Sequence, residues 1–297
     1  MKVHKGIIME KALEVIGLNK KLNMFSLNDV NFSVIEGHVV GFIGVNGAGK
    51  TTTIKTIMGL MLPDSGKIRA FGLEINKNEV AVKDRIGLLL EDCPYYEDLS
   101  LSQMKSILSP AYSNWDEKVF QSTIKRFQLP LSQKIGALSK GMKMKYSLAL
   151  ALSHHADLLI MDEPNSGLDP LIRSELMILL REFVQEKKGK SVLFSSHITS
   201  DIEKVADDVI MINDGKILFC ESLEQLMNTY KIINGKVENL SVELKKSLLN
   251  LNESGREFTG LTKNPEIYIY NEKIQVRAAT IEDIMLNYID NERSQYV

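Results

Sequence analysis

The sequence lacks the features of a chain that crosses a membrane or is secreted. Its longest apolar stretches, such as 39–45 and 158–161, are far shorter than the roughly 20 residues that a transmembrane helix needs. Residues 1–15 contain no sustained apolar core and no small-residue cleavage site, so no signal peptide is predicted. The only two cysteines, Cys93 and Cys220, cannot form a disulfide framework and favour a reducing compartment.

The sequence also lacks an excess of charge of either sign. The 36 basic and 38 acidic residues give a net charge of −2, so no overall field attracts nucleic acid. The composition, 44% hydrophobic and 25% charged, is that of an ordinary globular protein. A length of 297 residues allows one large domain and a smaller one.

Strand and helix patterns alternate along most of the chain. Short β-rich runs bounded by turns predict strands at 13–18, 30–35, 39–45, 67–71, 86–90, 158–161, 192–195 and 209–212. Helical spacing predicts helices from residue 50 to a stop at 63–66, throughout 99–153, and at 171–186, 200–206 and 222–230. This alternation favours a parallel sheet that is covered on both faces.

The composition of the sequence changes after Lys231, where Asn, Lys, Glu and Ser become frequent. We expect strands at 266–270 and 273–277, followed by a helix at 280–288 that Thr280 caps. Residues 231–297 are therefore predicted to form a small α+β domain, appended to a larger α/β domain at 1–230.

A glycine-rich segment follows the predicted strand at 39–45. It satisfies the pattern G-x-x-x-x-G-K-[ST], in which glycines let backbone N–H groups converge on phosphate oxygens. Lys50 would reach the β- and γ-phosphates, and the Thr51 hydroxyl would bind Mg²⁺. A strand–helix turn can match this pattern by chance, but the preceding apolar strand and the following helix favour a phosphate site. The predicted contacts are Gly44, Asn46, Gly47, Ala48, Gly49, Lys50, Thr51 and Thr52.

Two acids end the predicted strand at 158–161. Asp162 could hold Mg²⁺ together with Thr51, and Glu163 could polarise a water molecule for attack on the γ-phosphate. Strands often end in polar residues, so the pair alone is weak support for catalysis. The glycine-rich segment in the same chain makes a role of the two acids in metal binding and catalysis the favoured interpretation.

The segment Leu138-Ser139-Lys140-Gly141-Met142 opens another predicted helix, with Ser139 as its N-cap. In isolation this is a capped helix start, which can also bind an anion. We call residues 138–142 the signature segment.

The ordered set of segments resembles the ATPase subunit of an ATP-binding-cassette (ABC) transporter over about residues 10–230. It comprises the glycine-rich segment, the signature segment, 160–164 (IMDEP), 166–169 (SGLD) and 195–198 (SSHI). The resemblance implies a P-loop NTPase fold: a RecA-like mixed sheet, an N-terminal antiparallel β-subdomain and a helical subdomain at about 92–153. It also implies a dimer, identical or mixed, of two such subunits joined head to tail.

The resemblance also assigns roles to individual residues. Glu163 would be the general base, and His197 would contact the γ-phosphate. Ser139 and Gly141 would contact ATP held by the other subunit, and Asp169 would communicate across the dimer. Each ATP, with Mg²⁺, would lie between the glycine-rich segment of one subunit and the signature segment of the other.

Residues 139–170 and 280–289 resemble one bacterial branch more narrowly, the ATPases of Gram-positive exporters associated with GntR-type regulators and with peptide or antibiotic efflux. This implies a cytoplasmic subunit, peripheral on the inner face of the membrane, that drives a separate permease docked near 91–115. Two alternatives remain open: a regulatory subunit with little turnover, and a soluble ABC ATPase unconnected with transport. The absence of long heptad repeats weighs against DNA-repair ATPases.

Two positions depart from the family pattern at the nucleotide site. Glu91 stands where the family usually has a glutamine that senses Mg²⁺ and the membrane partner. Near the place of the usual adenine-stacking aromatic residue are Lys21, Leu22 and Phe25, and we expect Leu22 to take that position by apolar packing alone. In the signature segment, Lys140 and Met142 replace the common glycine and glutamine.

Overall fold

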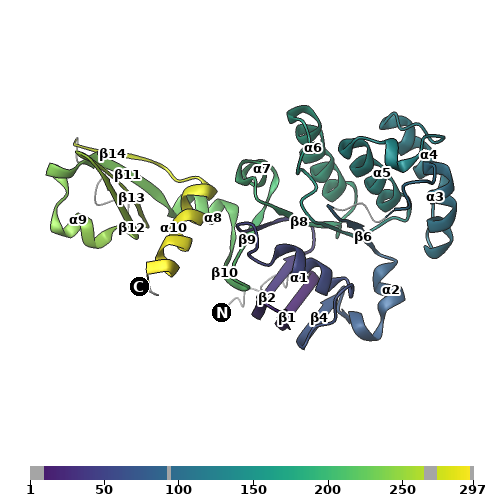
Figure 1. Ribbon diagram of the computed structural model, residues 1–297, viewed down its shortest axis with the longest axis horizontal. Coiled ribbons are helices and arrows are strands. Elements are labelled where there is room, and N and C mark those ends of the chain that lie inside the picture. The colour runs from purple at the N-terminus through teal and green to yellow at the C-terminus, as the bar shows by residue number, and fades with distance from the viewer. Residues whose placement is uncertain (1–9, 92–94, 264–272, 295–297) are drawn as a thin grey trace, which may run out of the picture.

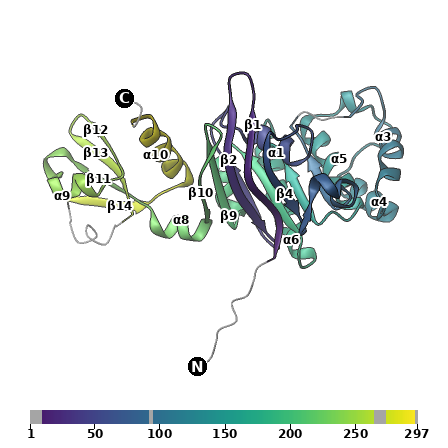
Figure 2. The same cartoon turned by 90° about the horizontal axis from the view of Figure 1, so that it is seen from below.

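The structure is a computed structural model that describes residues 10–91, 95–263 and 273–294 (Figure 1). Cys93 and the strand expected at 266–270 lie outside these residues, and Cys220 is exposed. Three sheets organise the described residues. An antiparallel sheet and a six-stranded mixed sheet lie together in one part of the molecule, and a second antiparallel sheet lies at the opposite end (Figures 1 and 2).

The six-stranded sheet positions the glycine-rich segment and the two acids. Its strands, in spatial order, are β10 (Lys216–Ser222), β9 (Asp208–Asn213), β3 (Val39–Ile43), β8 (Ser191–Ser196), β7 (Leu158–Met161) and β6 (Ile86–Leu89). Five strands are parallel, and β10 pairs antiparallel with β9 after the turn at Asp214 and Gly215. The mixed sheet predicted from the sequence is confirmed.

Both faces of this sheet are buried. Along β3, Val39 and Ile43 belong to one hydrophobic core, whereas Val40 and Phe42 belong to another, because successive strand residues point to opposite faces. This explains why β3, β7 and the middle of β8, residues 192–194, read as continuous apolar runs instead of alternating ones.

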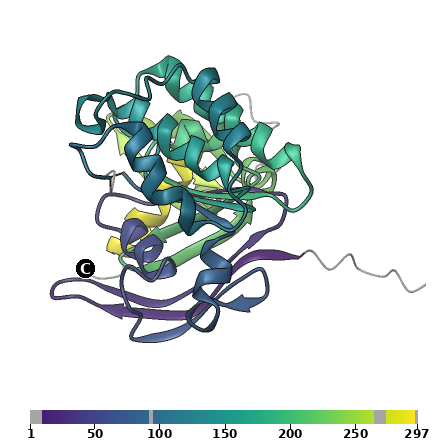
Figure 3. The ribbon, with the colours of Figure 1, turned by 90° about the vertical axis from the view of Figure 1, so that its right-hand side faces the viewer.

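Helices cover one face, and the N-terminal sheet with helices α1 (Lys50–Ile57) and α2 (Glu79–Lys83) covers the other (Figures 1 and 3). The helices of the first core are α3 (Leu101–Leu108), α4 (Glu117–Arg126), α5 (Lys140–Ser153), α6 (Pro170–Glu186), α7 (Thr199–Val205) and α8 (Leu223–Thr229). The second core contains α1, α2 and the sheet β2 (Ser26–Ile35), β1 (Lys11–Lys21), β4 (Ser65–Ala70) and β5 (Leu73–Glu74). Of the helices that the structure describes, none combines the length and the hydropathy needed to span a membrane.

Helix α1 ends earlier than the sequence pattern predicts. Its last residue is Ile57, and Gly59 follows with a φ of +69°, a conformation that glycine adopts without strain. The expectation that the helix continues to the turn at 63–66 was therefore wrong, since a glycine and not a proline terminates it.

The C-terminal sheet consists of β12 (Asn250–Ser254), β13 (Glu257–Thr262), β11 (Lys231–Lys236) and β14 (Ile274–Ala278), all paired antiparallel. Helix α9 (Val242–Ser247) packs with it around a small core of Ile233, Leu244, Phe258 and Ile274. The sequence pattern missed β11, β12, β13 and α9, because these elements are short and contain many polar residues.

Helix α10 (Ile281–Ser294) follows β14 and packs against α7 in the larger part of the molecule. Thr280 caps it as predicted, since its hydroxyl accepts a hydrogen bond from the backbone N–H of Asp283 at 3.1 Å. The backbone N–H of Ile281 donates to Glu203 of α7 at 2.6 Å. Ile281 and Ile284 are fully buried in the same core as Ile202 of α7.

Candidate functional site

The glycine-rich segment forms a tight loop between β3 and α1. Gly47 and Gly49 have φ values of +83° and +113°, which other residues rarely adopt. At Gly44 a Cβ atom would lie 2.3 Å from the carbonyl oxygen of Ile212, so only glycine fits there. The loop therefore needs its glycines. It leads into the N-terminus of α1, where the first backbone N–H groups of a helix have no partner within the helix.

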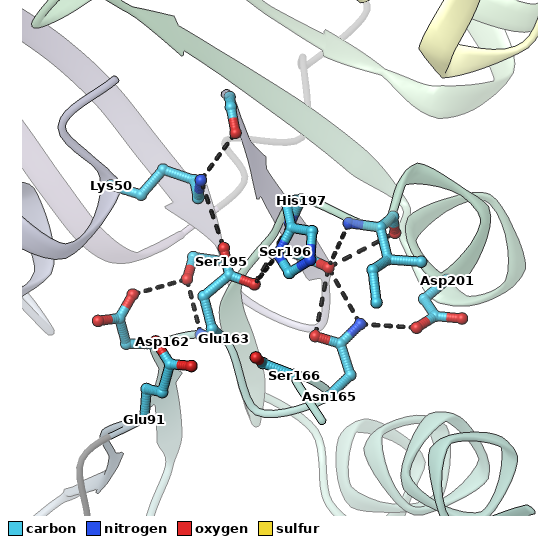
Figure 4. Close-up of polar contacts among 12 residues, drawn as sticks. Lys50, Glu91, Asp162, Glu163, Asn165, Ser166, Ser195, Ser196, His197 and Asp201 are labelled. Atoms are coloured by element: carbon cyan, nitrogen blue, oxygen red, sulfur yellow. Dashed lines mark hydrogen bonds and ion pairs between the residues drawn. The ribbon is translucent and has the colours of Figure 1, made fainter. Parts of the chain in front are cut away.

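Lys50, Glu163 and His197 form a cluster beside this loop (Figure 4). Lys50 Nζ donates to the carbonyl oxygen of Gly44 at 2.7 Å and lies 3.3 Å from Glu163 Oε1. The other carboxylate oxygen of Glu163, Oε2, lies 2.7 Å from His197 Nδ1. The side chains of Lys50 and Glu163 are only 6% and 8% exposed, so their charges interact with little solvent screening.

The backbone at Glu163 has a φ of +47°, although the residue is not glycine. This left-handed conformation is uncommon for a residue with a side chain, and strain of this kind concentrates at functional sites. The backbone N–H of Glu163 donates to Ser195 Oγ at 2.9 Å, which helps to hold the turn after β7 in place.

Asp162 lies deeper than Glu163. Burial raises its pKa, while hydrogen bonds from the hydroxyl groups of Ser195 and Thr51 oppose that rise. Ser195 Oγ donates to Asp162 Oδ1 at 2.8 Å. The Asp162 carboxylate and the Thr51 hydroxyl, which the sequence analysis paired as metal ligands, are thus neighbours.

A pocket of about 560 Å³ opens over the loop. Its lining residues are Leu22, Phe25, Asn46, Gly47, Gly49, Lys50, Thr51, Thr52, Glu91, Glu163, Ser166 and His197. Most of the predicted nucleotide contacts therefore surround one cavity. Gly44, Ala48 and Asp162 lie behind its wall.

An aromatic side chain lines this pocket, contrary to the expectation that Leu22 supplies the apolar contact alone. Phe25 lines it together with Leu22, and a Cβ atom on Gly49 would lie 2.8 Å from Phe25 Cζ. The β1–β2 connection folds back over the loop, and the residue spacing did not reveal this. An aromatic face is therefore available for a nucleotide base.

Three predicted contacts, Ser139, Gly141 and Asp169, do not line the pocket. Ser139 is exposed and caps α5 by accepting a hydrogen bond from the backbone N–H of Met142 at 3.2 Å. Asp169 is exposed and caps α6, and Gly141 is buried against Ile172, where a Cβ atom would lie 2.9 Å from Ile172 Cδ1. Within one chain, the signature segment therefore contributes nothing to this pocket.

The structure also contains a polar network that the sequence analysis missed. Asn165 Nδ2 donates to Ser196 Oγ at 3.0 Å and to Asp201 Oδ2 at 2.6 Å. Arg173 of α6 binds both carboxylate oxygens of Asp201, which is 1% exposed. The network ties the turn after β7 to the segment that carries His197. Its only sequence signal was a set of polar residues directly following two apolar strands.

The chemistry of the donors fits Mg²⁺ bound together with a triphosphate. Among the described residues, no group of three or more His, Cys, Asp or Glu side chains could hold a metal by itself. Mg²⁺ is typically held by one or two protein oxygens while phosphates and water complete its octahedron. One carboxylate and one hydroxyl beside a phosphate-binding loop match that requirement.

Comparisons with known proteins agree with this geometry. The family model described as "ABC transporter" matches residues 27–166. The bacitracin transport ATP-binding protein BcrA of Bacillus licheniformis is 36% identical over 195 residues, which cover 65% of this chain and 63% of BcrA. The ABC transporter ATP-binding protein NatA of Bacillus subtilis is 33% identical over 70% of this chain and 86% of NatA. The lantibiotic transport ATP-binding protein SrtF of Streptococcus pyogenes is 35% identical over 68% of this chain and 89% of SrtF.

Solved structures show the same fold. An ATP-binding subunit of an ABC transporter superimposes with a TM-score of 0.65 and 31% identity, over 72% of this chain and 91% of that one. A dimeric ATP-binding cassette in a post-hydrolysis state, with ADP and phosphate bound, superimposes with a TM-score of 0.63. Its identity of 22%, over 71% of this chain and 98% of that one, supports a likeness of fold alone.

Proposed function

The chain belongs to the ABC transporter family as an ATP-binding subunit whose ATP hydrolysis drives transport, and from this premise we propose that it powers a separate permease that exports peptides or antibiotic-like compounds. The Lys50–Glu163–His197 cluster is the observation that carries the catalytic part of the proposal. The relatives named for bacitracin and lantibiotic transport support the class of cargo.

Glu163 is the general base in this proposal. Its carboxylate accepts a proton from water while the water oxygen bonds to the γ-phosphorus, and the bond from that phosphorus to the bridging oxygen of ADP breaks. The 2.7 Å contact with His197 orients Glu163 Oε2 and supports this role. Because Lys50 also binds Oε1 at 3.3 Å, a triphosphate that draws Lys50 toward its own oxygens would free that oxygen for proton transfer.

Thr51 and Asp162 hold Mg²⁺ in this proposal. The metal supplies positive charge that offsets the charge on the phosphate oxygens. The Ser195 hydroxyl fixes Asp162 Oδ1 at 2.8 Å, so the chain itself orients this carboxylate.

We propose further that two subunits close around ATP. Exposure of Ser139 and Asp169, together with their absence from the pocket of their own chain, supports contacts with nucleotide held by a second subunit. In this arrangement the subunit is peripheral on the inner face of the membrane, bound to its permease. Tyr96 and Ile107, which are 68% and 54% exposed on the segment between β6 and α5, are apolar side chains available for that docking.

The test is to express the chain with a candidate permease, purify the complex and measure phosphate release while adding bacitracin or a lantibiotic. We expect co-purification and stimulated turnover, and we expect cells that carry the Glu163→Gln chain to become more sensitive to the stimulating peptide. The cargo class would be overturned by two results together. The purified complex would show basal turnover that no such peptide changes, and cells that carry the Glu163→Gln chain would be no more sensitive to these peptides. Absence of turnover in every assembled complex would overturn the catalytic proposal.

A further inference from the structure

We propose that Glu91 and Lys140 act as a positioning pair, which fixes the signature segment relative to the nucleotide pocket of the same chain. Lys140 Nζ lies 3.1 Å from Glu91 Oε1. The inference rests on the proposed function, since it concerns how two subunits close around ATP. It assigns a role to Glu91 and Lys140, two of the residues at which this sequence departs from the usual family pattern.

The pair joins parts of the site that are distant in sequence. Glu91 follows β6 and lines the nucleotide pocket, whereas Lys140 is the first residue of α5, directly after Ser139. Lys140 Nζ also lies 3.4 Å from Ser166 Oγ, in the loop after β7 that lines the same pocket. Figure 4 shows Ser166 on the same turn as Glu163, with the Glu91 side chain near that turn. One lysine therefore links the start of the signature helix to two walls of the pocket.

The path of the lysine stem is confined. A Cβ atom on Gly167, which has a φ of +67°, would lie 3.3 Å from Lys140 Cδ. Glycine at this position thus leaves room for the stem to cross the loop and reach Glu91. The contact between Lys140 and Glu91 therefore depends on the backbone at Gly167 as well as on the charge of the lysine.

The charges around the pair explain why the two residues belong together. Glu91 shares the pocket with Glu163, and two carboxylates facing a triphosphate would repel it unless a cation offset one of them. Glu91 is also near His197, which favours the ionised carboxylate. A lysine in the first turn of a helix opposes the helix dipole, so Lys140 gains from a carboxylate neighbour. Each residue offsets an unfavourable feature of the other.

The consequence concerns closure of the dimer. A signature segment that is held in place before ATP arrives binds with less loss of conformational freedom, so less ATP is needed. The two side chains are 43% and 41% exposed, so the effect is that of a solvent-screened pair and not of a buried one. Such a pair supports a change of about two- to fivefold.

The chain offers a matched control one helical turn further along. Lys143 of α5 lies 3.3 Å from Glu97, on the segment that leads to α3. This pair also links α5 to the segment that precedes α3, but neither residue lines the nucleotide pocket. Glu97→Gln and Lys143→Met therefore remove a similar charge pair without touching the proposed link.

The experiment is a double-mutant cycle on ATP-induced dimerisation, measured by light scattering after size exclusion in a Glu163→Gln background. We expect Glu91→Gln and Lys140→Met each to raise the ATP concentration for half-dimerisation about two- to fivefold, because an exposed ion pair is lost. The double variant should be no worse than either single one, and Lys140→Arg should retain normal closure. In 0.5 M salt the difference between the parent and the single variants should shrink.

Additive effects in the double variant, or equal effects from the Glu97 and Lys143 variants, would overturn the inference. If the Glu163→Gln parent failed to dimerise with ATP at any concentration, the proposed function would fail instead. Equal melting temperatures for all variants would show that the altered closure does not come from unfolding.

Discussion

Two sets of residues, one in the nucleotide pocket and one around the signature segment, occupy contrasting environments in this chain. Lys50 and Glu163 are 6% and 8% exposed and are held by several partners, whereas Lys140 and Glu91 are more than 40% exposed. Ser139 and Asp169 are exposed as well. Interactions of the first set are little screened by solvent, whereas those of the second set are exposed to solvent in the single chain. Under the proposed function, a second subunit would cover the second set. Substitutions in the two sets should therefore fail at different steps.

The largest expected effect comes from Glu163→Gln. The amide keeps the size of the side chain but cannot accept a proton, so we expect phosphate release to fall by about 10²–10⁴-fold, the usual contribution of a general base. ATP-dependent dimers should persist. The control is Glu175→Gln. It removes an exposed carboxylate of α6 that forms an ion pair with Lys145, and it should keep full turnover. Ordinary activity in the Glu163 variant would remove that residue from catalysis.

Lys50→Ala should act one step earlier, on nucleotide binding. A buried ammonium that donates charge-assisted hydrogen bonds is lost, so we expect ATP affinity to fall by about 10- to 100-fold. Titration calorimetry on the isolated chain measures this. Lys55→Ala, in the same helix but outside the pocket, should leave the affinity unchanged. Equal affinities for the two variants would contradict the assignment of Lys50.

Ser139→Ala tests the exposed set. The hydroxyl caps α5, and loss of such a cap costs about 0.5–2 kcal/mol of folding free energy. Ser100→Ala removes the cap of α3 and should cost a similar amount. Both variants should bind ATP normally as single chains, but only Ser139→Ala should weaken ATP-induced dimers. A dimerisation defect of equal size in the Ser100 variant would assign the effect to folding.

The smallest expected effect is a change in the titration of Glu91. Burial alone would raise its pKa, but hydrogen bonds from Lys140 and Ser166 outweigh burial and hold the pKa below 4.5. The ionised carboxylate therefore stabilises the fold above about pH 4.5, its ordinary value, and that contribution is lost as the pH falls through the lowered pKa. In Lys140→Met the pKa should rise, as followed by NMR of ¹³C-labelled glutamate carboxyl groups. An unchanged pKa would show that Lys140 does not pair with Glu91 in solution.

The same contrast explains how much the sequence could predict. The glycine-rich loop and the two acids after β7 were recognisable because each occupies consecutive positions next to an apolar strand. The parallel part of the sheet followed from the alternation of strands and helices, its mixed character from the family resemblance, and Thr280 from its place before a helix. These features depend on local order, which the sequence displays directly.

Features that join distant segments were not predictable in this way. Phe25 reaches the pocket only because the β1–β2 connection folds back over Gly49. The network around Asp201 needs residues from three separate elements. The strands after Lys231 show no clear alternation, because neighbouring residues such as Ile232 and Ile233 are both buried, on opposite faces.

The contact between Glu203 and the start of α10 has a consequence for the order in which the chain folds. Residues 281–289 complete the core that contains Ile202 and Val205, yet the ribosome makes them well after every strand of the six-stranded sheet. Domains generally begin to fold while synthesis continues. During that interval the apolar side chains of α7 that α10 covers in the finished fold lack that cover, so the core around Ile202 is completed only when the last helix has been made.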